Sequence, residues 1–153
     1  VHWDPYFFPL DAIADWNRIY GRRGFVQYQC VIPQGRARPV LAEMLDRVSR
    51  RGDASFLAVL KQLGEGGGPM SFPLRGYTLT MDFPVTATLF AFLDQLDALV
   101  VEAGGRLYLA KDARQSRTTF ESGYPGLAVL RDIRQQTGAN TRLASHLSAR
   151  LGI

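Results

Sequence analysis

The stretch FVQYQCVIP, residues 25–33, sets the fold class of this chain. It is dense in β-branched and aromatic residues, and a proline closes it, as is typical of a β-strand. Directly after it, apolar residues recur at helical spacing over residues 38–51, and Gly52 supplies a helix stop. The sequence therefore predicts a strand that is followed by a long helix.

The next part of the chain repeats this alternation. The further predicted elements are strands at residues 55–63, 77–83 and 106–110, and a helix that Thr86 caps and Gly104-Gly105 ends. The apolar face of that helix is expected to hold Leu89, Phe90, Leu93, Leu96 and Val100. The resulting order is the ferredoxin-like βαββαβ plan, an α+β fold whose antiparallel sheet carries both long helices on one face.

The two ends of the chain predict short helices. Asp11 is the expected N-cap of a helix that ends at Gly21, with Ile13, Trp16 and Ile19 on one face. Residues 116–153 predict a helical tail that is broken at Pro125 and Gly138. We expect residues 1–153 to form a single domain with this tail.

Composition excludes several classes of protein. A hydrophobic content of 46% is too high for a disordered chain, and no apolar run reaches the roughly 18 residues of a membrane span. The net charge of +4 permits an anionic partner without requiring one. Cys30 is the only cysteine, which excludes an internal disulfide, and we expect it to be a small buried apolar residue. With only two distant histidines, no metal site is expected.

Polar side chains interrupt the predicted strands at positions that share a side. Two glutamines alternate on the first strand and two threonines on the third, while the only two lysines lie near strand ends. Amides, hydroxyls and ammonium groups at short reach suit a polyhydroxylated ligand, although a solvated sheet face is the alternative. The set consists of Gln27, Gln29, Lys61, Thr78, Thr80 and Lys111.

Five segments carry a resemblance to a known family. They are FFPLDAIADWNRIYGRRGFVQYQCVIP (residues 7–33), SFLAVLKQLG (55–64), SFPLRGYTLTMDFP (71–84), GGRLYLAKDAR (104–114) and SHLSARLGI (145–153). Through these segments the chain resembles the C-terminal, substrate-binding half of FAD-linked aldonolactone-type oxidases, in particular the decaprenylphosphoryl-ribose 2-oxidase group.

The resemblance implies an enzyme that oxidises a sugar hydroxyl to a ketone, with hydride transfer to FAD. It also implies that an N-terminal domain outside this chain holds FAD and is the partner of residues 1–153, which we expect to be inactive alone. Lys111 would be the catalytic residue beside the flavin and the sugar, acting either as a fixed charge or in proton transfer. Tyr108 would lie at the flavin edge. The substrate pocket would be lined by Gln27, Gln29, Lys61, Thr78 and Thr80.

Two positions depart from the family pattern. The ribose-oxidase group typically has Asn at the position of Thr78 and Cys at that of Thr80, so the substrate is open between a lipid-linked pentose, an aldonolactone and another sugar. The sequence does not identify the electron acceptor either. A lipid-linked substrate would give the basic cluster Arg47, Arg50 and Arg51 a role at a membrane surface, whereas the helix dipole alone accounts for cations at a helix end. We expect a cytoplasmic or peripheral membrane location.

The alternative hypothesis is that the chain is a ferredoxin-like binding module without enzymatic activity. Ferredoxin-like sheets bind single-stranded RNA through exposed rings, and Tyr28, Tyr77 and Phe83 lie on the predicted strands. The sequence has no RNA-binding motif of that class, so no nucleic-acid partner is expected. A metabolite-binding or assembly domain is the other alternative.

Overall fold

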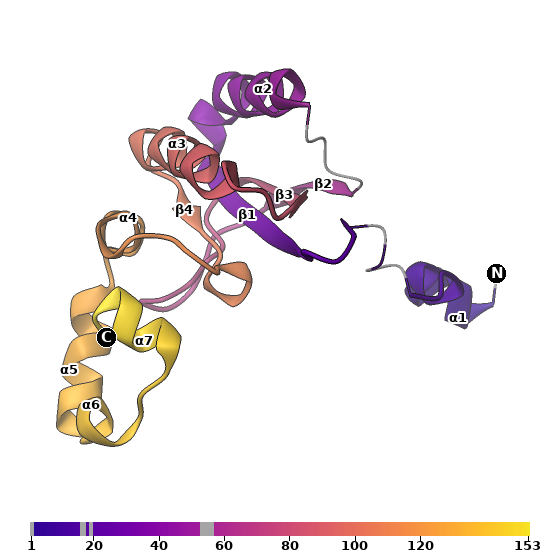
Figure 1. Cartoon of the computed structure of the whole chain (residues 1–153). Coiled ribbons are helices and arrows are strands. Elements are labelled where there is room, and N and C mark those ends of the chain that lie inside the picture. Colours follow the sequence, from indigo (N-terminus) through magenta and orange to yellow (C-terminus); the bar gives the residue numbers. More distant parts are fainter. Residues whose placement is uncertain (1, 16–17, 19, 53–56) are drawn as a thin grey trace.

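The computed structural model describes residues 2–15, 18, 20–52 and 57–153 (Figure 1). It confirms the predicted α+β fold, with an antiparallel sheet of strand order β2-β3-β1-β4. In Figure 1, both long helices lie on the same side of this sheet. The βαββαβ elements are β1 (Phe25–Pro33), α2 (Gln34–Arg51), β2 (Ala58–Leu63), β3 (Gly76–Pro84), α3 (Leu89–Glu102) and β4 (Arg106–Leu107).

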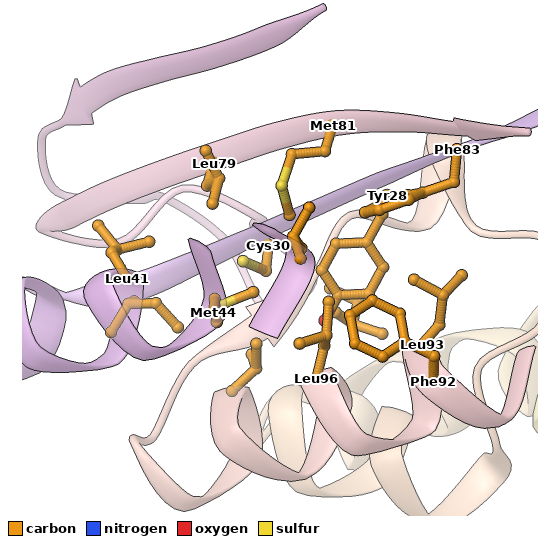
Figure 2. Close-up of a cluster of buried hydrophobic side chains, with 14 of the residues drawn as sticks. Tyr28, Cys30, Leu41, Met44, Leu79, Met81, Phe83, Phe92, Leu93 and Leu96 are labelled. Carbon is orange, nitrogen blue, oxygen red and sulfur yellow. The ribbon is translucent and has the colours of Figure 1, made fainter. Parts of the chain in front are cut away.

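The main core fills the space between the sheet and the two helices (Figure 2). Cys30 pairs with Leu79 across β1 and β3, and both side chains point toward the helices with Met44 of α2. Cys30 is fully buried, as expected, and burial raises the pKa of its thiol to about 12. The thiol therefore stays protonated at neutral pH and behaves as an apolar group.

Helix α2 begins four residues before its predicted start, at Gln34. Pro39 lies inside the helix. Proline lacks a backbone N–H and is tolerated best in the first turn, so its position had favoured a helix start close to residue 39. The helix ends as predicted at Gly52, whose φ of 79° is the left-handed conformation that glycine adopts most easily.

Helix α3 differs from its prediction at the start. The N-cap is Thr88, and Thr86 instead accepts a hydrogen bond of 2.9 Å from Arg51. Phe90 is 47% exposed rather than buried, because the buried stripe of this helix follows Leu89 at helical spacing and includes Phe92. The remaining predicted core positions of α3 are buried.

The fourth strand is shorter than predicted. It pairs with β1 only over Arg106–Leu107, and a 3₁₀ turn, η3 (Leu109–Lys111), follows. The Tyr108 amide still donates to the Gln29 carbonyl at 2.9 Å, after which the chain leaves the sheet edge. Lys111 therefore lies on a turn and not at the end of a strand.

The N-terminal helix prediction is wrong in its extent. The structure has a short helix, α1 (Trp3–Phe7), and a 3₁₀ turn, η1 (Pro9–Ala12), that contains Asp11. Asp15 adopts a left-handed φ of 54°, which interrupts a right-handed helix, and Ile13 is 55% exposed. Trp16 and Ile19 lie outside the described residues. Figure 1 shows α1 away from the sheet.

The C-terminal tail forms the predicted short helices with breaks at Pro125 and Gly138. A second apolar cluster joins them, formed by Phe120, Tyr124, Leu127 and Leu151. The Tyr124 hydroxyl donates to the Leu107 carbonyl at 2.6 Å, which ties this cluster to β4. The helices are α4 (Arg117–Gly123), α5 (Leu127–Gln136), α6 (Ala139–Arg142) and α7 (His146–Leu151).

A buried carboxylate attaches the last helix to the segment after η3. Asp112 accepts hydrogen bonds from the amides of Arg114 and Gln115, from the Gln115 side chain, and from Arg150 of α7 at 2.9 Å. Burial by itself would raise the pKa of Asp112, but these hydrogen bonds outweigh it and lower the pKa. In the described part of the chain, no helix is both long and apolar enough to span a bilayer.

Truncation of a core side chain tests the packing between sheet and helices. Met44 is fully buried, so Met44→Ala is expected to lower the free energy of unfolding by about 2–5 kcal/mol. Leu45, on the same helix, is 46% exposed, and Leu45→Ala is the matched control with a loss of about 1 kcal/mol or less. Urea unfolding followed by circular dichroism measures both. Equal losses would contradict the assigned face of α2.

The lowered pKa of Asp112 predicts a pH-dependent stability. Its contribution is complete above the unfolded pKa of about 3.9 and is lost as the pH falls through the lower folded pKa. Asp112→Asn is therefore expected to cost about 1–3 kcal/mol at pH 7. The difference from wild type should shrink as the pH falls below about 4.

Unfolding midpoints measured across this pH range provide the test. Asp46→Asn is the matched control, because Asp46 forms an exposed ion pair with Arg50. Its effect should be about 0.5 kcal/mol or less. If the stability difference between Asp112→Asn and the wild type did not change with pH, the carboxylate charge would make no contribution to stability.

Candidate functional site

The strand register places five of the predicted site residues on one face of the sheet. Gln29 pairs with Thr80, and Lys61 pairs with Thr78, so the partners in each pair point to the same side. Gln27 follows at the next position of that side of β1. On β1 and β3, the neighbouring residues Tyr28, Cys30, Leu79 and Met81 point into the core beneath the helices. All five polar side chains therefore belong to the face that carries no long helix.

A hydrogen bond to Thr78 fixes the orientation of the Gln29 side chain on this face. Its Nε2 donates to Thr78 Oγ1 at 3.0 Å. Thr78 is only 2% exposed, so it supports Gln29 from below and offers little surface of its own. Thr80 is half-buried beside Gln29, and Lys61 is exposed on the edge strand β2.

Four of the predicted residues meet where β4 ends. Gln27, Gln29, Tyr108 and Lys111 line the same cavity at the edge of β1. Its volume of about 20 Å³ is close to the room that one water molecule needs. A ligand larger than a water molecule would therefore have to contact these residues from outside the cavity. Lys61, Thr78 and Thr80 do not line it.

Lys111 carries a charge that no carboxylate neutralises within the described part of the chain. Its side chain is half-buried, and the ion pairs formed by those residues do not include it. The next charged residues along the chain have partners of their own: Asp112 pairs with Arg150, and Arg114 pairs with two carboxylates of α3. The charge of the Lys111 ammonium group is therefore left uncompensated by the described residues.

Arg114 and Asp97 form a buried ion pair that sequence reasoning did not identify. Arg114 contacts both carboxylate oxygens of Asp97 and reaches Asp94 at 2.5 Å. Burial raises the pKa of Asp97, against the opposing effect of the arginine. A signal was present in the sequence, because Asp97 follows Leu93 by four residues on the apolar stripe of α3.

Asp112 and Arg114 are neighbours in sequence but do not form an ion pair with each other. The backbone amide of Arg114 donates to Asp112 at 2.8 Å, while the guanidinium turns to α3. Among the described residues there is no cluster of His, Cys, Asp and Glu that could hold a metal ion.

The rings proposed for RNA stacking are not accessible. Tyr28 and Phe83 lie in the core beneath the helices, with 4% and 0% of their surface exposed, and Tyr77 packs against that core. The structure therefore removes the feature on which an RNA-binding hypothesis rested. The two histidines are exposed, and His2 caps α1 by accepting from the Asp4 amide at 3.3 Å.

The basic cluster of α2 has local partners. Arg47 pairs with Glu43, and Arg50 with Asp46, each one helical turn away. Arg51 lies over the Phe92 ring at 4.9 Å and donates to Thr86. These contacts, together with the helix dipole, account for the cluster without a membrane surface.

Comparison with known proteins supports the resemblance that the motifs indicated. No protein-family model matches the chain. The chain is 40% identical over 147 residues to decaprenylphosphoryl-beta-D-ribose oxidase of Mycolicibacterium smegmatis, covering 95% of this chain and 32% of that protein. It is 37% identical over 144 residues to an uncharacterized protein in the mprA 5' region of Streptomyces coelicolor, covering 92% of this chain and 39% of that protein. The chain thus spans less than half of each relative, and it is similar over nearly its whole length to a part of a decaprenylphosphoryl-ribose oxidase.

Proposed function

We propose that this chain is the substrate-binding part of an FAD-dependent oxidoreductase that oxidises a sugar hydroxyl. The observation that carries the proposal is Lys111, a half-buried cation without a carboxylate partner among the described residues, on the same cavity as Gln27, Gln29 and Tyr108. The similarity to a sugar-phosphoryl oxidase supports it. The flavin-binding part of the protein is the proposed partner of this chain.

The residues at the end of β4 fit a flavin ring. An uncompensated ammonium suits a ring that gains negative charge on reduction, and the half-buried Tyr108 offers an aromatic surface next to it. In this proposal the flavin-binding part outside this chain would hold the rest of the cofactor. When bound, FAD would supply the hydride acceptor.

The protein side chains would bind and orient the sugar. The amides of Gln27 and Gln29 and the hydroxyl of Thr80 provide donors and acceptors for adjacent hydroxyl groups. Thr78 would hold Gln29 in its rotamer, and Lys61 would contact a more distant part of the substrate. Lys111 would place its charge at the reacting hydroxyl oxygen and the flavin edge. The substrate class is a sugar or a lipid-linked sugar.

Removal of Lys111 tests the proposal in the longer protein that carries this chain with its flavin. Lys111→Ala is expected to slow anaerobic flavin bleaching by sugar by a factor of about 10²–10³, the usual loss for one preorganised charge or donor. Stopped-flow absorbance measures the rate.

Lys111→Arg separates the two roles of the lysine. Arginine keeps the charge but does not deprotonate, so partial retention of bleaching indicates an electrostatic role and full loss indicates proton transfer. Lys111→Ala with near-normal bleaching would contradict the site. A wild-type protein that binds sugars without any flavin bleaching would indicate a binding module instead.

The support of Gln29 by Thr78 gives a second test. Thr78→Val keeps the shape but removes the acceptor of the 3.0 Å hydrogen bond, so Gln29 loses its fixed rotamer. We expect the half-saturating sugar concentration to rise about tenfold, equivalent to one hydrogen bond of about 1.4 kcal/mol, with a smaller change in maximal bleaching rate. Thr118→Val is the control on the exposed helix α4. An unchanged half-saturation in Thr78→Val would remove Gln29 from the sugar contacts.

A further inference from the structure

The turn that carries Lys111 has few main-chain restraints of its own. After Tyr108 leaves the sheet, the amides of Lys111 and Asp112 donate back to Tyr108 and Leu109 at 3.1 and 3.3 Å. These bonds lie within the turn and do not connect it to the sheet. The position of the Lys111 side chain relative to Gln27 and Gln29 therefore depends on what holds the residues that follow it.

Asp112 is the point at which the turn is held from outside. Three of its hydrogen bonds come from residues no more than three positions away in sequence. The fourth comes from Arg150 of α7, whose Nη2 donates to Oδ2 at 2.9 Å while its Nη1 donates to the Gln115 carbonyl at 2.6 Å. The Asp112 side chain is only 4% exposed, whereas the Arg150 side chain is 29% exposed, so the carboxylate end of this contact is buried.

The helix that bears Arg150 is itself fixed. Leu151, the next residue, is fully buried in the second apolar cluster with Phe120 and Tyr124. Ser145 and Ser148 form a capping box at its start. The Tyr124 hydroxyl donates to the Leu107 carbonyl of β4, so the second apolar cluster is attached to the sheet edge that carries the cavity. Arg150 therefore connects the turn to this cluster.

We propose that Arg150 is a positioning residue for Lys111, so that the C-terminal helix forms part of the active-site framework. This inference rests on the proposed function and extends it to a residue that contacts neither cavity nor substrate. Arg150 acts on Asp112, which directly follows Lys111. The start of the turn is attached to β1 through the Tyr108 amide, and Arg114 attaches the segment after Asp112 to α3 through Asp97. Loss of Arg150 would leave Asp112 with only its local hydrogen bonds to residues 114 and 115.

The test combines catalysis with the chemical reactivity of Lys111 in the longer flavin-containing protein. Arg150→Ala is expected to lower the maximal rate of flavin bleaching by up to about 100-fold, with less change in half-saturating sugar, because misplacement by about 1 Å has effects of that size. Acylation of Lys111 by a water-soluble ester, relative to the exposed Lys61, is expected to rise. Arg150→Lys should restore part of both.

Arg131→Ala is the matched control. Arg131 also contacts the last helix, donating to the Gly152 carbonyl at 3.2 Å and pairing with Glu121, but it does not touch Asp112. It should leave both the bleaching rate and the Lys111 acylation ratio unchanged. Asp112→Asn removes the negative charge and replaces the oxygen that accepts from Arg150 with an NH2 donor, while the other oxygen can still accept from the backbone amides. It should therefore reproduce the Arg150→Ala effect, and the double variant should add little.

The outcomes separate the two proposals. Equal effects of Arg131→Ala and Arg150→Ala, or an unchanged acylation ratio in both Arg150→Ala and Asp112→Asn, would overturn the positioning role. If none of the sugars tested bleaches the flavin of the wild-type protein, the proposed function fails. The acylation ratio alone then decides whether Arg150 holds Lys111. If Arg150→Ala does not fold, Asp112→Asn and Arg150→Lys carry the test.

Discussion

The antiparallel register between β1 and β3 is the constraint on which the rest of the molecule depends. Side chains alternate along a strand, so the pairing of Cys30 with Leu79 assigns every other residue of both strands to the core beneath the helices. The same register brings Gln29 beside Thr80 on the opposite face. A slip by one residue would bury the amides and hydroxyls and expose the core, which makes fold and candidate site consequences of one choice of register.

The early end of β4 turns this polar face into a site. In the register of β1 with β4, a longer edge strand would have placed Lys111 opposite Val26, with its side chain on the helix-covered side of the sheet. Because β4 pairs over only two residues and the chain then turns, Tyr108 and Lys111 come back to the cavity that Gln27 and Gln29 line. The turn lacks regular main-chain pairing, and its placement comes from buried charges, an arrangement often found where a functional side chain must be held at the edge of a sheet.

The buried ionic contacts next to this turn illustrate why burial and pairing have to be considered together. A carboxylate as buried as Asp97 or Asp112 is costly unless hydrogen bonds and an opposite charge compensate it. Asp112 has enough donors for its pKa to fall, whereas burial dominates at Asp97 and its pKa rises despite Arg114. Lys111, which directly precedes Asp112, is in no ion pair of the described residues.

The sequence by itself determined the order of strands and helices, the short C-terminal helices, and the set of polar residues on the open face. These follow from local periodicity and from prolines and glycines, which act over a few residues. It did not determine the early end of β4 or the exposure of Phe90, because each depends on where distant segments pack. The partners of Asp97 and Asp112 likewise come from residues far along the chain. Only the tertiary structure decided that Arg150 meets the turn of Lys111, since the second apolar cluster folds α7 back onto it.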